Sequence, residues 1–203
     1  MTKEFELDPQ AEIWIILDAT ETGQASLPFT WPKRTKEDLW KHKFEFTLPP
    51  STEEYGVSVA ASITRYFLRK GRSVGFITSG QVRTMIPPDR GGRQMGKILE
   101  SLALLRSQGK LPVWGLIDIH AQHLSRGSTI VLITHSVEKE VVVAADFLAR
   151  RGLRPVVVLI DAASFNGPEG TDELADGLRN MRIPLRIVRR DDDITNALSF
   201  ELH

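Results

Sequence analysis

The chain has 203 residues, of which 41% are hydrophobic, and its 26 Lys and Arg side chains balance 26 Asp and Glu. This composition is typical of a globular protein with a substantial core, and it excludes collagen-like and extended disordered chains. Balanced charge gives no global field that favours nucleic acid, an anionic membrane or an acidic partner, so any recognition must be local. The absence of cysteine excludes a disulfide scaffold, a Cys-ligated zinc and a thiol nucleophile.

Strand-like and helix-like patterns alternate along the chain. Residues 13–17 are a short apolar run rich in β-branched side chains, which predicts a strand buried on both faces. Apolar residues at three- and four-residue steps predict a helix over 52–70, capped by Ser51 or Thr52. By the same criteria, further strands are predicted at 73–78, 82–86, 129–134, 155–160 and 184–188, and further helices at 91–105, 117–124, 137–151 and 172–180.

This alternation predicts an α/β protein with parallel strands, right-handed crossovers and helices on both faces of one sheet. The tight turn at Gly80 and Gln81 sets residues 82–86 antiparallel at a sheet edge. We therefore expect a single domain over residues 1–203, with three α/β/α layers and a mostly parallel, Rossmann-like sheet that has one antiparallel edge strand.

Residues 23–50 are long for a link between a strand and a helix, and they read as an insertion. They contain Phe29, Trp31, Trp40, Phe44 and Phe46, together with five Lys and Arg side chains between residues 33 and 43. Two interpretations of this insertion are possible: a long loop that carries a function, or a hairpin packed on the edge of the sheet. The aromatic residues favour a local mini-core, although exposed ones would anchor a partner.

Asp18, Thr20 and Thr22 follow the first predicted strand at alternate positions. Ligands of open α/β sheets bind beyond the carboxyl ends of the strands, so these side chains are candidates for a site. One carboxylate and two hydroxyls offer hard oxygens that suit a magnesium-class cation. The alternative is that Asp18 caps a turn while the threonines bond to the backbone.

Six segments in order resemble the bacterial domain-of-unknown-function family fifty-eight, whose members have a von Willebrand factor A-like fold. They are residues 16–20 (ILDAT), 52–62 (TEEYGVSVAAS), 71–75 (GRSVG), 87–94 (PPDRGGRQ), 98–103 (ILESLA) and 126–134 (RGSTIVLIT). The resemblance covers residues 3–160. It implies a metal-site-like (MIDAS-like) edge, where such domains hold a metal with an Asp-x-Ser-x-Ser motif, a later Thr and a further Asp.

By position, Asp18, Thr20 and Thr22 match the Asp-x-Ser-x-Ser motif, with threonine in place of each serine. The later loops depart from it, with Arg93 after Gly91-Gly92 in place of Thr, and His135 between Thr134 and Ser136 in place of Asp. A guanidinium near Asp18 competes with a cation, so we expect Arg93 to pair with Asp18. No metal or other cofactor is then expected, beyond weak magnesium binding at Asp18, Thr20 and Thr22. The predicted binding edge comprises Asp18, Thr20, Thr22, Arg93, Thr134, His135 and Ser136.

The resemblance implies a non-catalytic protein-interaction or adaptor domain that works with a MoxR-type AAA+ ATPase in assembling or maturing protein complexes. It also implies that this chain is a fragment of a membrane-anchored protein, with the domain in the cytoplasm and residues 2–7 ending the preceding segment. No nucleic-acid partner and no membrane contact by the fragment itself are expected.

Two other functions remain open. A magnesium-dependent phosphohydrolase like the haloacid dehalogenases would use Asp18 as nucleophile, with Thr78 or Ser79 after the next strand and acids from Asp161 or residues 191–193. The lysine and the magnesium-binding acid that such an enzyme needs are not evident. The third possibility is a scaffold that binds a peptide by strand addition beside residues 82–86.

Overall fold

A six-stranded sheet forms the centre of the computed structural model, which describes residues 11–30 and 48–198. The strand order is β3-β2-β1-β4-β5-β6. The strands are β1 (Ile13–Leu17), β2 (Val74–Ser79), β3 (Arg83–Asp89), β4 (Thr129–Thr134), β5 (Arg154–Ile160) and β6 (Leu185–Val188). All neighbours pair in parallel except β2 and β3. The predicted mostly parallel sheet with one antiparallel edge strand is confirmed.

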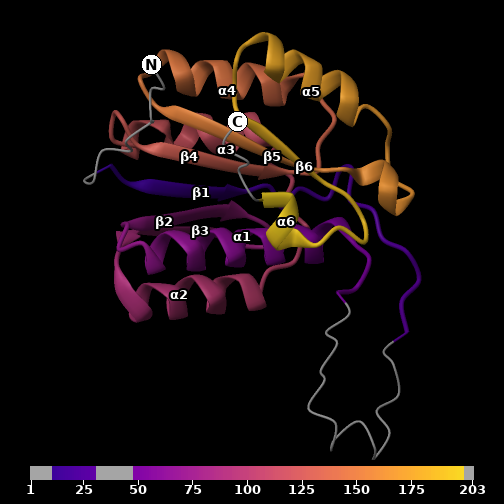
Figure 1. The fold of residues 1–203 in the computed structure, drawn as a ribbon, viewed down its shortest axis with the longest axis horizontal. Helices are drawn as coiled ribbons and strands as arrows, with labels where there is room; N and C mark the ends of the chain where they lie inside the picture. Colours follow the sequence, from indigo (N-terminus) through magenta and orange to yellow (C-terminus); the bar gives the residue numbers. More distant parts are fainter. Residues whose placement is uncertain (1–10, 31–47, 199–203) are drawn as a thin grey trace, which may run out of the picture.

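Helices cover both faces of this sheet, as Figure 1 shows. They are α1 (Thr52–Arg69), α2 (Gly91–Ala103), α3 (Val113–His120), α4 (Glu140–Arg150), α5 (Thr171–Asn180) and α6 (Ile194–Leu198), with short 3₁₀ turns at Ala121–His123 and Ala162–Phe165. Helices α1, α2 and α6 pack on one face, and α3, α4 and α5 on the other. The three predicted layers are therefore present.

Strand β1 lies in the middle of the sheet because all five of its residues are apolar and suit burial on both faces. Ile13, Ile15 and Leu17 enter the core beneath α1, while Trp14 and Ile16 enter the core beneath α4. This alternation of side chains fixes the register of β1 between β2 and β4.

Strand β3 runs to Asp89, past the predicted end at Ile86, and so includes Pro87 and Pro88. Proline cannot donate a ladder hydrogen bond, but β3 is an edge strand, where one row of backbone groups needs no partner. The pairing with β2 shifts register between Val74 and Phe76, which pair with Asp89 and Ile86, so the two prolines lie within the irregular stretch. Helix α3 also differs from its prediction, since it begins at Val113, directly after Pro112.

The ends of the predicted insertion are held together. Ser26 bridges Ser51, and the Leu27 backbone amide donates to the Pro50 carbonyl at 2.9 Å. Ser51 then caps α1 by accepting from the Glu54 amide at 3.1 Å, which confirms one of the two predicted caps. Trp31, Trp40, Phe44, Phe46 and the basic residues of 33–43 lie outside the described residues, as do residues 2–7.

The five parallel strands all end on the same side of the molecule, which we call the carboxyl edge, and begin on the opposite side, the amino edge (Figure 1). Within the described residues, no helix is both long and apolar enough to cross a membrane.

Candidate functional site

Asp18 lies at the carboxyl edge, directly after the central strand β1, and its side chain is buried. Its backbone amide donates to the Ile133 carbonyl at 2.9 Å, which holds it against the end of β4. The last residue of β4 is Thr134, so two neighbouring strands deliver a carboxylate and a hydroxyl to one point.

Both carboxylate oxygens of Asp18 accept hydrogen bonds from within the chain. Oδ1 accepts from the Thr20 backbone amide at 3.0 Å and from the Thr20 hydroxyl at 2.7 Å. Oδ2 accepts from the Thr134 hydroxyl at 2.6 Å. A buried carboxylate needs such donors, because removing it from water without them is costly. Asp18 therefore caps a turn, as the alternative interpretation predicted, but the Thr20 hydroxyl bonds to the carboxylate rather than to the backbone.

His135 is buried beside this carboxylate, with Nδ1 4.0 Å from Asp18 Oδ2. Its Nε2 lies 3.0 Å from the Thr22 carbonyl, and because a carbonyl can only accept, Nε2 carries the proton. In the neutral ring Nδ1 is then an acceptor, and the Gln24 amide nitrogen lies 3.4 Å from it. His135 thus joins the loop after β1 to the loop after β4.

Gln24 completes this network, although the sequence did not single it out. Its amide nitrogen also donates to the Thr20 carbonyl at 3.2 Å, and its carbonyl accepts from the Thr52 hydroxyl. The Thr52 oxygen accepts in turn from the Ala25 amide at 3.1 Å. One glutamine therefore links the loop after β1, the start of α1 and His135.

A segment ending at Gly109 crosses the carboxyl edge beside the same loop. The Gly109 amide donates to the Ala19 carbonyl at 3.0 Å, and its carbonyl accepts from the Glu21 amide at 2.9 Å. A Cβ on Gly109 would lie 1.9 Å from the Ser79 carbonyl oxygen, so only glycine fits. This crossing fixes residues 19–21 and so orients Asp18 and Thr20.

Six of the seven predicted edge residues lie together at the carboxyl edge: Asp18, Thr20, Thr22, Thr134, His135 and Ser136. Thr22 differs from its prediction, because it is exposed and its carbonyl, rather than its hydroxyl, takes part in the network. The Ser136 amide donates to the Thr134 hydroxyl oxygen at 3.0 Å, and Ser136 Oγ accepts from the Glu138 amide at 3.2 Å.

The structure does not bring Arg93 to Asp18, contrary to the predicted ion pair. Arg93 is exposed in the first turn of α2, which follows β3, and the last residue of β3, Asp89, pairs with Val74 at the start of β2. Because β3 is antiparallel, α2 begins at the amino edge. The length of β2, about 17–20 Å, therefore separates Arg93 from the Asp18 end of the sheet.

The donor set around Asp18 does not fit a strong magnesium site. Among the described residues, Asp18 is the only acid in the hydrogen-bonded group, the exposed Thr22 contributes its carbonyl to that group, and the His135 imidazole lies 4.0 Å from Oδ2. Magnesium prefers several hard oxygen ligands in octahedral geometry. Residues 11–30 and 48–198 also contain no group of three or more His, Asp or Glu side chains arranged to hold a metal.

A second acid at the carboxyl edge, Asp161, follows β5 and is also engaged. Its Oδ1 accepts from the Thr171 hydroxyl at 2.8 Å, and its Oδ2 accepts from Arg189 Nε at 3.1 Å. Arg189 Nη2 lies 3.7 Å from Asp172 as well. Asp161 is two strands from Asp18, roughly 10 Å, which is too far to share a metal or a proton with it.

Comparison with solved structures defines the fold. The chain resembles an aerotolerance-related membrane protein from Bacteroides fragilis bearing multiple mutations to serine, with a TM-score of 0.55 and 15% identity, covering 92% of this chain and 94% of that one. It also resembles BatB from Bacteroides thetaiotaomicron, with a TM-score of 0.56, 16% identity and coverage of 92% and 93%. A third similar structure is proximal thread matrix protein 1 of the mussel byssus, with a TM-score of 0.52 and 11% identity, covering 95% of this chain and 45% of that one.

No protein-family model matches the chain, and no curated protein matches it. At such low identities the structural likeness shows the fold alone, and membership of the family that the sequence resembles stays a prediction. The chain has a von Willebrand factor A-like α/β fold, and its candidate site lies at the carboxyl edge of the sheet.

Proposed function

We propose that this chain is a non-catalytic protein-interaction domain that binds its partner with the carboxyl edge of its sheet. The observation that carries the proposal is the engagement of Asp18: the residue is 5% exposed, and both of its carboxylate oxygens accept hydrogen bonds from Thr20 and Thr134. A carboxylate held in this way orders the loops around it and is poorly placed to attack a substrate. We therefore interpret the network as a scaffold for the surface above it.

That surface is formed by exposed side chains of the two loops that the network joins. Glu21 and Thr22 come from the loop after β1, and Glu138 and Lys139 from the loop after β4, with Ser136 half-buried between them. Further along the edge, Glu169, Asp172 and Glu173 are exposed near the start of α5. This mainly acidic rim favours a partner with a basic surface.

The partner we propose is a MoxR-type AAA+ ATPase, which the resemblance of residues 3–160 implies, acting with this domain in the assembly or maturation of protein complexes. One structural neighbour is described as an aerotolerance-related membrane protein. This description supports the proposal that the parent protein of this chain is membrane-anchored. We further propose, from the resemblance of residues 3–160, that the parent protein presents the domain in the cytoplasm.

A binding assay with a MoxR-type ATPase from the same organism tests this function. The double variant Glu21→Lys with Glu138→Lys reverses two exposed charges at the rim, and we expect its affinity to fall about tenfold or more. Asp118→Lys reverses an exposed acid on α3, away from the rim, and is expected to bind like the wild type. Equal affinities for all three proteins, or no binding by the wild type, would overturn the proposal.

The phosphohydrolase alternative is not supported, since Thr78 donates its hydroxyl to the Leu17 carbonyl at 2.9 Å and Asp161 is engaged by Thr171 and Arg189. A generic phosphate ester with magnesium gives a direct check. We expect the wild type to hydrolyse the ester no faster than the Asp18→Asn variant does. Hydrolysis by the wild type that Asp18→Asn abolishes would contradict the interaction proposal and show that the protein is an enzyme.

A further inference from the structure

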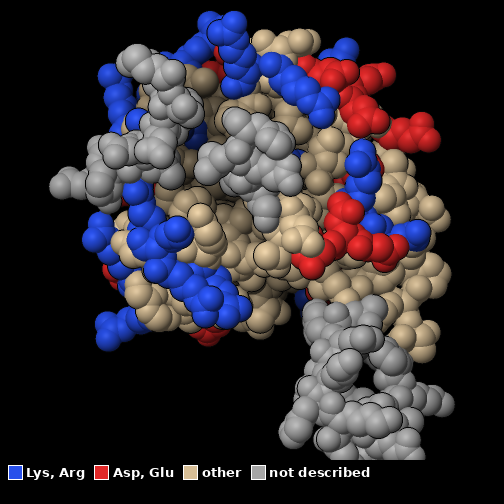
Figure 2. Space-filling model, viewed as in Figure 1, with Lys and Arg blue, Asp and Glu red and all other residues tan. Residues whose placement is uncertain are grey.

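The amino edge of the sheet gathers basic side chains, although the whole chain is neutral. Helices α1, α4 and α5 end at this edge, and α2 begins there because β3 is antiparallel. The exposed bases on these helix ends and adjoining turns are Arg69, Lys70, Arg90, Arg93, Arg126, Arg150, Arg151, Arg154, Arg179 and Arg182. In Figure 2, Lys and Arg lie mainly over the half where the strands begin, and Asp and Glu mainly over the other half.

Acidic side chains among the described residues neutralise little of this edge. Asp146 pairs with Arg150 at 2.6 Å and Asp176 with Arg179 at 2.8 Å, both on exposed helix surface. Asp89 accepts from the Arg90 backbone amide, and the half-buried Glu12 accepts from the Trp14 indole. Basic residues at helix C-termini are favoured by the helix dipole, but that preference does not account for Arg126, Arg154 or the bases beside β3.

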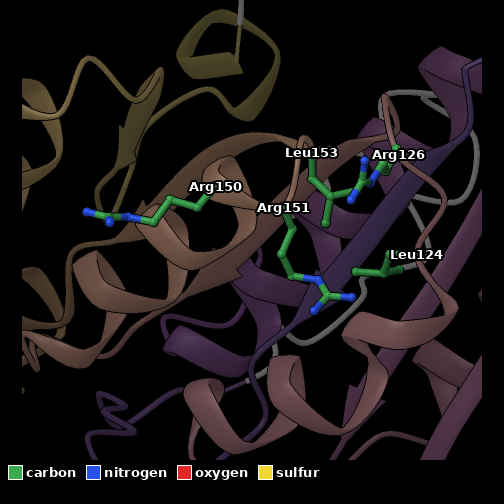
Figure 3. A pocket seen from close by; sticks show the side chains of 5 residues that line it. All are labelled: Leu124, Arg126, Arg150, Arg151 and Leu153. Carbon is green, nitrogen blue, oxygen red and sulfur yellow. The ribbon is translucent and has the colours of Figure 1, made fainter.

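A pocket of about 220 Å³ lies within this basic edge, lined by Leu124, Arg126, Arg150, Arg151 and Leu153. Figure 3 shows Arg126 and Arg151 on either side of the leucines, while Arg150 points away from them. The two turns that flank the pocket are joined by a hydrogen bond from the Gly127 amide to the Gly152 carbonyl at 2.8 Å. Within the described part of the chain, Arg126 has no hydrogen bond or ion pair.

The Arg151 guanidinium is also free of acidic partners among the described residues, and its carbon lies 5.5 Å from the centre of the Phe147 ring. The guanidinium groups of Arg126 and Arg151 lie beside a shallow pocket and suit a phosphate group, because guanidinium binds phosphate through paired hydrogen bonds. The volume is below that of ordinary small-molecule sites, so it suits a phosphate on a larger surface better than a whole cofactor.

We propose that the amino edge docks on a membrane surface rich in acidic phospholipids, with a lipid phosphate between Arg126 and Arg151. The bases lie along the whole width of the sheet, whose neighbouring strands are about 4.8 Å apart. They therefore form a broad band, which is wider than a site for one small ligand. Tyr66 and Met181, 56% and 41% exposed, stand beside Lys70 and Arg182 at this edge. Aromatic and apolar side chains among bases fit the headgroup interface better than the polar backbone of duplex DNA.

This inference departs from the expectation that the fragment makes no membrane contact, which took no account of how the charges are distributed over the surface. It is independent of the proposed protein partner, because it uses the opposite edge of the sheet. In such an orientation the carboxyl edge faces away from the lipid and remains open to a protein.

Vesicle co-sedimentation tests the proposal. We expect the wild-type protein to bind vesicles of phosphatidylcholine mixed with phosphatidylglycerol, and not vesicles of phosphatidylcholine alone. Arg126→Glu with Arg151→Glu should weaken binding about tenfold or more. Lys110→Glu with Lys139→Glu makes the same change in net charge with exposed residues at the carboxyl edge, and is expected to change binding no more than about twofold.

A second pair, Arg90→Glu with Arg93→Glu, tests whether the whole edge takes part and is expected to weaken binding as well. Circular dichroism confirms that each variant is folded. Failure of the wild type to bind acidic vesicles would overturn the proposal, as would equal losses in the Lys110/Lys139 pair. Binding of inorganic phosphate or duplex DNA without binding of vesicles would also overturn it, in favour of a small-anion or nucleic-acid site.

Discussion

The Thr134 hydroxyl lies 2.6 Å from the Asp18 carboxylate, although 116 residues separate the two in the chain. Thr134→Val keeps the shape of the side chain and removes this donor. We expect the free energy of unfolding to fall by about 1–3 kcal/mol, because Oδ2 loses its donor and the Ser136 amide loses the hydroxyl oxygen to which it donates. Urea denaturation measures the change.

Thr129→Val is the matched control for that experiment. Thr129 begins the same strand β4, and its buried hydroxyl has no hydrogen-bond partner among the described residues. Replacing it is expected to leave stability unchanged or slightly higher. Equal losses for the two valine variants would show that the bond to Asp18 contributes nothing specific.

The weak magnesium binding that we expect can be tested by restoring a second acid. Calorimetry on the wild type should show a dissociation constant weaker than about 1 mM. His135→Asp places a carboxylate where an imidazole now lies 4.0 Å from Asp18, so the variant should lose stability without metal and regain it when magnesium is added. Tight binding by the wild type that Asp18→Ala removes would contradict this view of the site.

Gly109→Ala should be severely destabilising. The new methyl carbon would lie 1.9 Å from the Ser79 carbonyl oxygen, a backbone atom that cannot move without opening the end of β2. We expect a loss of about 3 kcal/mol or more in thermal or urea unfolding. In Gly96→Ala on α2 the methyl group meets nothing within 4 Å, and a gain of up to about 1 kcal/mol is expected.

The stability of the fold should depend on pH through His120, which is buried with both ring nitrogens unpartnered among the described residues. Burial lowers the pKa of His120 below its ordinary value of 6.5, and the charges of Arg83 and His123 lower it further. The unfolded chain therefore takes up this proton first. The free energy of unfolding is highest above pH 6.5 and falls as the pH drops through 6.5 towards the folded-state pKa.

Urea midpoints measured on both sides of that pH test the assignment. His120→Leu should flatten the pH dependence, because the titrating group is gone. His123→Gln leaves His120 in place and should retain most of it. A wild type whose stability rises on acidification would contradict a lowered pKa for His120.

The sequence predicted the order and type of most elements because their hydrophobic periods are regular. Strand β1 is entirely apolar, and α1 repeats its buried residues at helical spacing. The position of Asp18 followed from the rule that parallel sheets bind ligands at their carboxyl ends. The pairing of Arg93 with Asp18 failed because motif alignment ignored strand direction: residues 82–86 were already predicted to be antiparallel, which sends the following helix to the far edge.

Gln24 and the Asp161–Arg189 pair could not be found in the same way. Gln24 is a polar residue in a loop, and its partners Thr52 and His135 lie 28 and 111 residues away. Arg189 reaches Asp161 from the end of β6. Only the three-dimensional pairing of the strands brings such groups together, since no local period records it.

Among the described residues, exposed bases predominate at the amino edge and exposed acids at the carboxyl edge, and this uneven distribution gives the described part of the molecule an electric dipole. Near a charged body such a molecule experiences a torque, which turns it without pulling it strongly as a whole. Salt confines that torque to the last 8 Å or so of an approach at physiological ionic strength. The domain is therefore aligned just before contact, and the sign of the approaching surface selects which end it meets.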